Sequence, residues 1–194
     1  SIIEASEKDL PSIIEKIKDG SYSGFNVTLP FKQKILNYVD KAINDAEATG
    51  SINTLLLDSD KAVIGENTDV YGLQAAYLKE IENRSKKNAL IIGAWGVSPS
   101  VILSIQKSGI SNISITNRTN EKCIFLKKKF KFLNIVLWEN LEQEIKNFDI
   151  IINATSLGLK NGEDFNFNFA NTRSKVIYID TIYNPLETKT YKYL

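Results

Sequence analysis

The chain has 194 residues, of which 43% are hydrophobic and 24% are charged, and its formal net charge is +1. The composition predicts a globular protein of one or two domains, and the low charge and short apolar runs predict a cytoplasmic chain without a nucleic-acid or membrane partner. One cysteine and no histidine exclude an internal disulfide and serine–histidine or cysteine–histidine catalysis, so acid–base chemistry must use Lys, Asp, Glu or Tyr.

Short strand and helix patterns alternate along the first third of the chain. Asp9 and Pro11 predict the start of a helix whose apolar stripe runs from Leu10 to Ile17. Asp58-Ser59-Asp60 separates two apolar runs and predicts a hairpin turn. The predicted elements are, in order, a strand end at 1–5, a helix at 10–17, a strand at 24–29, helices at 31–39 and 42–48, and strands at 51–57 and 61–65.

Lys32 lies where the predicted strand 24–29 is followed by the helix 31–39. Pro30 cannot donate a hydrogen bond within a sheet, so it ends the strand, and its ring suits the first turn of a helix. Ligands of open sheets usually bind at such strand ends. The alternative is that Lys32 is a solvated surface lysine, as most lysines are.

Asp69 follows the second hairpin strand and precedes an apolar stripe that runs from Leu73 to Ile81. This position predicts a helix N-cap. A catalytic role is the alternative, and the two are compatible if the start of the helix faces a ligand.

A polar stretch at 82–87 predicts a domain boundary. Residues 88–92 then form an apolar run without alternation, which is typical of a strand that is covered on both faces. The run continues into the turn 93–99 and an apolar helical pattern. Strand, glycine turn and helix predict a dinucleotide site, where backbone amides at the helix N-terminus hold pyrophosphate. A plain strand–helix turn is the alternative, because Trp95 interrupts the glycine pattern.

The next predicted strand, 110–116, ends in Asn117-Arg118-Thr119, with Lys122 close behind. At this position an acidic residue selects NAD, whereas a basic residue selects the 2′-phosphate of NADP. Arg118 can grip a phosphate with its planar guanidinium, and Thr119 can cap the following helix. The pattern therefore favours NADP.

Basic and aromatic residues mix at 127–132. We interpret this segment as the outer face of a helix rather than a nucleic-acid patch, with the core face formed by Ile124, Leu126, Phe130 and Leu133. Cys123 is predicted to be a packing residue. Further strands are predicted at 135–138, 148–152 and 175–179, which completes a parallel, doubly wound α/β sheet with its polar clusters at the carboxyl ends of strands.

Seven segments resemble the shikimate dehydrogenase family, and they follow the family's order across nearly the whole chain. They are GFNVTLPFK at 24–32, GSINT at 50–54, GENTD at 65–69, GAWG at 93–96, NRT at 117–119, NATSLGL at 153–159 and DTIYNP at 180–185. The resemblance implies NADP-dependent, reversible reduction of 3-dehydroshikimate to shikimate, in the pathway to chorismate and aromatic amino acids. It also implies a substrate-binding catalytic domain at 1–84 and a Rossmann-type NADP domain at 85–194.

The same resemblance assigns roles to individual residues. Lys32 is implied to be the catalytic acid–base and Asp69 its partner at the reacting carbon. The implied substrate contacts are Thr28, Asn53, Asp69 and Tyr183. The implied cofactor positions are Gly93, Ala94, Trp95, Gly96, Val97, Asn117, Arg118, Thr119, Lys122 and Thr181. We expect a small-molecule substrate, no metal, and a monomer or homodimer.

Three departures accompany the match. The family's early serine-x-serine motif has no counterpart, and neither does its C-terminal segment with a cofactor glycine and a substrate glutamine, so we expect a fragment with an incomplete site. Trp95 and Pro99 replace a glycine and a basic residue in the phosphate turn. The alternatives are a quinate or shikimate dehydrogenase that uses NAD, and a non-catalytic protein that keeps the dinucleotide fold.

Overall fold

The computed structural model describes residues 2–160 and 163–190. The chain forms two compact units, of which the first ends at Gly72 and the second begins at Leu73. The polar stretch 82–87 lies within the second unit. Each unit has its own sheet and its own hydrophobic core.

The first unit contains a four-stranded sheet in the order β1-β3-β4-β2. β1 and β4 both pair antiparallel with β3, and β2 pairs parallel with β4. The elements of this part of the chain are η1 (Glu7–Asp9), α1 (Leu10–Lys18), β1 (Gly24–Asn26), η2 (Lys34–Asn37), β2 (Lys41–Ala42), α2 (Asp45–Thr49), β3 (Thr54–Leu57), β4 (Val63–Glu66) and α3 (Asp69–Leu73).

The core of the first unit forms where α1 packs on this sheet. The predicted apolar stripe is confirmed, because Leu10, Ile14 and Ile17 are buried together with Leu55 and Val63. These contacts remove one face of the helix and one face of the sheet from water, which is what holds a helix of nine residues in place.

Several predicted elements of this unit were wrong in extent. Residues 2–5 form no strand, and β1 already ends at Asn26. Residues 29–33 form turns, so a 3-10 helix at Lys34–Asn37 replaces the predicted helix at 31–39. The predicted helix at 42–48 is divided between β2 and α2.

The second unit contains a five-stranded, entirely parallel sheet in the order β7-β6-β5-β8-β9. This arrangement confirms the predicted doubly wound sheet. Its elements are η3 (Gln74–Leu78), η4 (Arg84–Lys86), β5 (Asn88–Ile92), α4 (Ser98–Lys107), β6 (Asn112–Thr116), α5 (Asn120–Lys129), β7 (Asn134–Ile135), η5 (Trp138–Asn140), α6 (Leu141–Glu144), η6 (Ile145–Asn147), β8 (Ile150–Asn153), η7 (Phe169–Asn171) and β9 (Ile177–Asp180).

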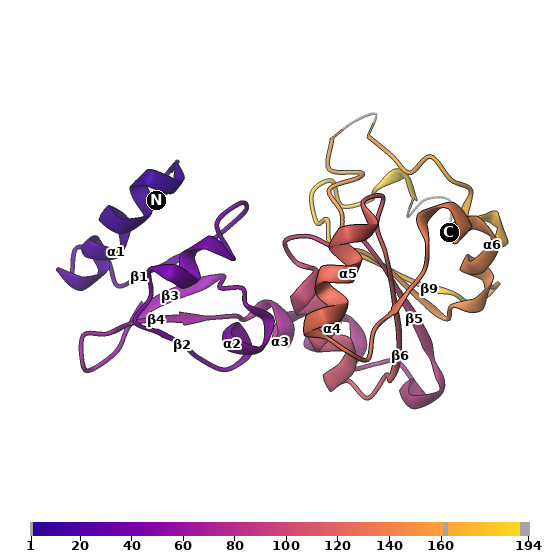
Figure 1. Cartoon of the computed structure of the whole chain (residues 1–194), viewed down its shortest axis with the longest axis horizontal. Coiled ribbons are helices and arrows are strands. Elements are labelled where there is room, and N and C mark those ends of the chain that lie inside the picture. Colours follow the sequence, from indigo (N-terminus) through magenta and orange to yellow (C-terminus); the bar gives the residue numbers. More distant parts are fainter. Residues whose placement is uncertain (1, 161–162, 191–194) are drawn as a thin grey trace. The chain divides into compact units, whose positions relative to one another are not determined.

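Successive residues of β5 point to opposite faces of this sheet, and both faces are covered. Ala89 and Ile91 pack in one cluster with α4 and α5, whereas Leu90 and Ile92 pack in another with α6 and η7. Figure 1 shows α6 on the side of the sheet away from α4 and α5. Burial on both faces explains why β5 is an unbroken apolar run.

The residues of α5 largely follow the prediction. Cys123, Leu126 and Phe130 are buried in the core. Ile124 was wrongly placed there, because its side chain is 43% exposed. Successive residues of a helix point about 100° apart, so the stripe that buries Cys123 and Leu126 turns Ile124 outward.

Candidate active site

Lys32 lies in the turn that leads to η2, and its backbone is fixed by neighbouring segments. Its carbonyl accepts a hydrogen bond of 2.7 Å from the backbone N–H of Ile52, which is itself buried. The Lys32 side chain is only 17% exposed, and its Nζ donates to Oδ2 of Asp69 over 2.7 Å. The interpretation of Lys32 as a solvated surface residue is therefore wrong.

Asp69 is the first residue of α3, and both of its carboxylate oxygens have partners. Oδ2 accepts from Lys32, and Oδ1 accepts from Nδ2 of Asn53 over 2.8 Å. The backbone N–H of Asp69 donates to Oδ1 of Asn67 over 3.0 Å. Asn67 thus supplies a cap-like bond at the start of α3, which leaves the Asp69 carboxylate to orient the ammonium of Lys32.

Asn53 lies just before β3 and joins three segments of the chain. Its backbone N–H donates to Glu66 and its carbonyl accepts from Val27, so its position is set by the sheet. In addition to Asp69, its side-chain Nδ2 donates to Oγ1 of Thr68 over 3.0 Å, and its Oδ1 accepts from the Thr68 N–H over 2.9 Å. Asn53 thereby fixes the segment that carries Asp69.

The structure thus brings together Lys32, Asn53 and Asp69, three of the predicted residues. Thr28 lies four residues before Lys32 and is exposed, and its carbonyl accepts from the N–H of Phe31. Asn67 and Thr68 also contribute to this arrangement, and neither was predicted to do so, although both stand in the motif GENTD. The signal that could have identified Asn67 is its place between a predicted strand and a predicted helix, and the structure shows that it is buried there and hydrogen-bonded.

In the second unit, the turn after β5 has the backbone that the glycine pattern predicted. Gly93 and Gly96 have positive φ angles of 110° and 53°. A Cβ atom on Gly93 would lie 2.8 Å from backbone atoms of Ala154, so only glycine fits there. Ser98 holds the turn closed, because its Oγ accepts from the Trp95 N–H and donates to the carbonyl of Gly93.

The turn after β6 lies at the same edge of the sheet, because Ile92 pairs with Thr116. Asn117 links the two turns, since its Oδ1 accepts from the N–H of Ala94 over 3.3 Å and its Nδ2 donates to the Thr119 carbonyl over 3.0 Å. Arg118 is exposed beside them. Predicted cofactor residues from both turns therefore meet at the carboxyl edge of the sheet.

The structure also tests whether these residues suit a dinucleotide. Arg118 and Lys122 are exposed cations, and α4 begins with its amino end directly after the glycine turn. Cations and a helix N-terminus are the groups that bind phosphates. The exposed indole of Trp95 stands in the turn itself, and Val97 is the N-cap residue of α4. The donor set therefore fits a phosphorylated nucleotide.

At the end of β9, Asp180 anchors the segment that carries Thr181 and Tyr183. Its Oδ1 accepts from Nδ2 of Asn153 and from the N–H of Ile182, both within 3.1 Å. Thr181 is tied to the Asn153 carbonyl through its N–H and its Oγ1. The Tyr183 side chain is 85% exposed. Thr181 thus shares the carboxyl edge with the glycine turn.

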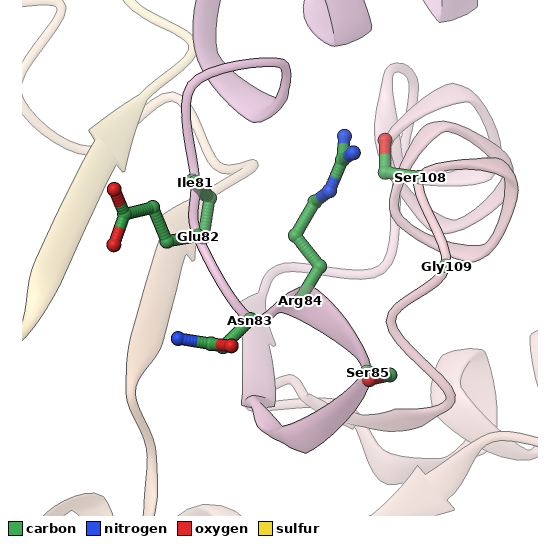
Figure 2. Close-up of a pocket in the computed structure, with 7 residues that line it drawn as sticks. All are labelled: Ile81, Glu82, Asn83, Arg84, Ser85, Ser108 and Gly109. Carbon is green, nitrogen blue, oxygen red and sulfur yellow. The ribbon is translucent and has the colours of Figure 1, made fainter.

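A shallow pocket of about 550 Å³ lies elsewhere in the second unit. Figure 2 shows its lining and the Arg84 side chain that extends toward Ser108 at the end of α4. The lining residues are Ile81, Glu82, Asn83, Arg84, Ser85, Ser108 and Gly109. They precede β5 and β6, so the pocket lies at the amino edge of the parallel sheet. It contains none of the predicted site residues. Arg84 near the C-terminus of α4 is explained by the favourable interaction of a cation with that end of a helix, so the pocket is not assigned a function.

Among residues 2–160 and 163–190, no group of three or more acidic, histidine or cysteine side chains is arranged to hold a metal ion. In the same part of the chain, no helix is both long and apolar enough to cross a membrane.

Comparisons with known proteins identify the same family as the sequence motifs that carry these residues. Residues 1–55 match the family described as shikimate dehydrogenase substrate binding domain, and residues 76–185 match shikimate / quinate 5-dehydrogenase. The chain is 38% identical over 184 residues to the shikimate dehydrogenase (NADP(+)) of Pelagibacter ubique, a match that covers 95% of this chain and 68% of that protein.

Solved structures give the same result. Shikimate dehydrogenase from Aquifex aeolicus superimposes with a TM-score of 0.88 at 33% identity, covering 98% of this chain and 69% of that one. Shikimate 5-dehydrogenase from Thermus thermophilus, in complex with NADP(H) and shikimate, gives a TM-score of 0.84 at 26% identity, covering 97% and 69%. The chain spans about two-thirds of the length of these relatives.

Proposed function

The chain belongs to the shikimate / quinate dehydrogenase family, and we propose from this premise that it catalyses the NADP-dependent, reversible reduction of 3-dehydroshikimate to shikimate. The observation that carries the proposal is the hydrogen-bonded arrangement of Lys32, Asp69 and Asn53. Relatives are named for this reaction and this cofactor. A cytoplasmic location and a monomeric or homodimeric state remain predictions.

Lys32 is assigned the proton transfer. Its ammonium has three N–H donors, and the bond to Oδ2 of Asp69 uses one of them. Another N–H group of the same ammonium can donate to the substrate oxygen that is a carbonyl in 3-dehydroshikimate and a hydroxyl in shikimate. Negative charge grows on that oxygen during reduction, so a nearby cation stabilises it and can deliver the proton.

Asp69 and Asn53 are assigned the orientation of Lys32 and of the substrate. The carboxylate holds Nζ from one side, and Asn53 holds the carboxylate through its other oxygen. Pre-organised groups of this kind contribute to catalysis because they need not rearrange as the transition state forms. Asn53 and Thr28 are neutral polar residues that suit the substrate's hydroxyl groups, and Tyr183 remains a predicted substrate contact.

The carboxyl edge of the second sheet is assigned to NADP. When bound, NADP supplies or accepts the hydride of the reaction. The amino end of α4 and the turn 93–97 would hold the pyrophosphate, and Arg118 and Lys122 would hold the 2′-phosphate. Asn117 would hold the turn after β5 and the turn after β6 together. Thr119 and Thr181 are the remaining predicted cofactor residues at this edge of the sheet.

The test is an absorbance assay of dinucleotide reduction on this chain, with shikimate or quinate as substrate and NADP or NAD as oxidant. The proposal predicts turnover with shikimate and NADP above the other three combinations. Preference for quinate and NAD would favour the second candidate, which the basic residue Arg118 at the end of β6 argues against. Nucleotide binding without turnover of either substrate would favour a non-catalytic protein.

A further inference from the structure

Trp95 and Lys122 come from different elements and contact each other. Trp95 lies in the turn after β5, and Lys122 lies in the first turn of α5. The Lys122 Nζ is 4.5 Å from the centroid of the Trp95 ring, within the range of a cation–π interaction. The indole is 58% exposed, so it does not serve as a core residue.

The position of Lys122 is electrostatically unusual. α5 begins at Asn120, and the amino end of a helix carries partial positive charge, which disfavours a cation there. Arg118 adds a second cation just before the helix. Glu121 is the acidic residue of this first turn, but neighbouring positions of a helix do not face each other. A phosphate at this place would neutralise both cations, and the Trp95 ring stabilises Lys122 there without one.

We propose that Trp95 is a positioning residue for the 2′-phosphate of NADP, because its indole holds the ammonium of Lys122 at the carboxyl edge of β5 and β6. This inference rests on the proposed function. A free lysine side chain loses rotamer freedom when it binds a ligand, and a side chain already held in place loses less. The buried Pro99 offers no charge to the site, so the placement of Lys122 matters more.

A competing explanation is that Trp95 only occupies space near the pyrophosphate. NAD and NADP share the pyrophosphate and differ in the 2′-phosphate alone. A steric effect therefore changes the affinity for both dinucleotides equally, whereas an effect through Lys122 changes the affinity for NADP relative to NAD. The ratio of the two dissociation constants separates the explanations.

The experiment is a double-mutant cycle in which calorimetry measures the dissociation constants for NADP and NAD. The variants are Trp95→Gly, Lys122→Ala and the double substitution, with Trp95→Phe as a conservative replacement. We expect Trp95→Gly to reduce the preference for NADP by about 2- to 5-fold, the effect of an exposed cation–π contact. It should have no such effect when Lys122 is already alanine, and Trp95→Phe should keep part of the preference.

Lys128→Ala is the matched control, because it removes the same charge from the last turn of α5 and should leave the preference unchanged. Additive effects in the cycle, or equal changes in both dissociation constants, would overturn the role of Trp95 while leaving the proposed function intact. Failure of the unaltered chain to bind either dinucleotide would overturn the proposed function and this inference together.

Discussion

The ammonium of Lys32 lies 2.7 Å from a carboxylate oxygen of Asp69, although the two residues are 37 positions apart in the chain. The hairpin of β3 and β4 brings them together. Ile52, just before β3, holds the backbone of Lys32, and Asn53 lies beside the segment after β4 that carries Asp69. Both side chains are largely shielded from water, so their interaction is screened less than a surface ion pair. The candidate chemistry therefore depends on the register of one hairpin.

Asn53 tests how this arrangement is held. Replacing Asn53 with alanine removes the donor to Asp69 and leaves the N–H of Thr68 without its side-chain acceptor. The expected loss is about 1–3 kcal/mol in the free energy of unfolding, because polar groups lose their partners. Urea denaturation followed by circular dichroism measures it.

Asn53→Asp should be worse at neutral pH, because a second carboxylate would then face Oδ1 of Asp69. Two carboxylates at this distance repel each other when both are ionised. The destabilisation relative to Asn53→Ala should therefore be small in acid, where the carboxyls are protonated, and should grow as the pH rises to neutral. A variant that is no less stable than Asn53→Ala at neutral pH would contradict the assigned contact.

Gly93 tests the dinucleotide turn. A substitution with alanine strains a residue whose φ is 110° and brings its Cβ to 2.8 Å from backbone atoms of Ala154. Gly109 is a matched control, because its φ is 87° but nothing lies within 4 Å of a Cβ there. Backbone strain alone costs about 1–3 kcal/mol, so Gly93→Ala should exceed Gly109→Ala by the additional clash. Equal free energies of unfolding for the two variants would show that the turn has room to adjust.

Cys123 tests the packing of α5. Its side chain is fully buried, and this burial raises the pKa of the thiol from 9.0 to about 11. Such a shift means about 100-fold less thiolate at a given pH below both values, so alkylation should be slower than in urea by at least about that factor. Cys123 is the chain's only cysteine, so the labelling rate reports on it alone. Equal rates in the two conditions would contradict the burial.

The same shift has a consequence for stability. The folded-state pKa of Cys123 is above the unfolded value, so its contribution to stability is complete below about pH 9 and is lost as the pH rises toward about 11. Cys123→Ala should lack this part of the pH dependence. The comparison is made by urea denaturation across that range.

Much of the second unit could be predicted from its sequence because local patterns and packing agree there. The unbroken apolar run of β5 and the polar residues after each strand indicated a parallel sheet with ligands at its carboxyl edge, and the structure confirms the sheet. The helix at Asn120–Lys129 followed from the same kind of pattern. Within this helix Ile124 was misassigned, since one residue's direction on a short helix is weakly specified. The strand predicted at 135–138 was also wrong in extent, because β7 covers only Asn134–Ile135 and Trp138 begins η5.

The first unit was less predictable, because long-range hydrogen bonds decide its details. β2 has two residues, Lys41 and Ala42, and forms through pairing with β4, which leaves no alternating pattern to detect. Asn67 and Thr68 act by fixing Asp69 and Asn53, and such contacts become visible only after the hairpin is in register. The pattern at Asp69 fitted a helix cap, whereas the folded chain uses its carboxylate to hold Lys32.

The central claim is that Lys32 performs the proton transfer in shikimate oxidation. The most direct measurement compares kcat for the unaltered chain, Lys32→Ala and Lys34→Ala with shikimate and NADP. Lys34 is the matched control, because it is an exposed lysine of the neighbouring η2 that pairs with Glu7. We predict that Lys32→Ala lowers kcat by about 10²- to 10⁴-fold while NADP binding is kept, and that Lys34→Ala retains activity. Unchanged turnover in Lys32→Ala would contradict the account.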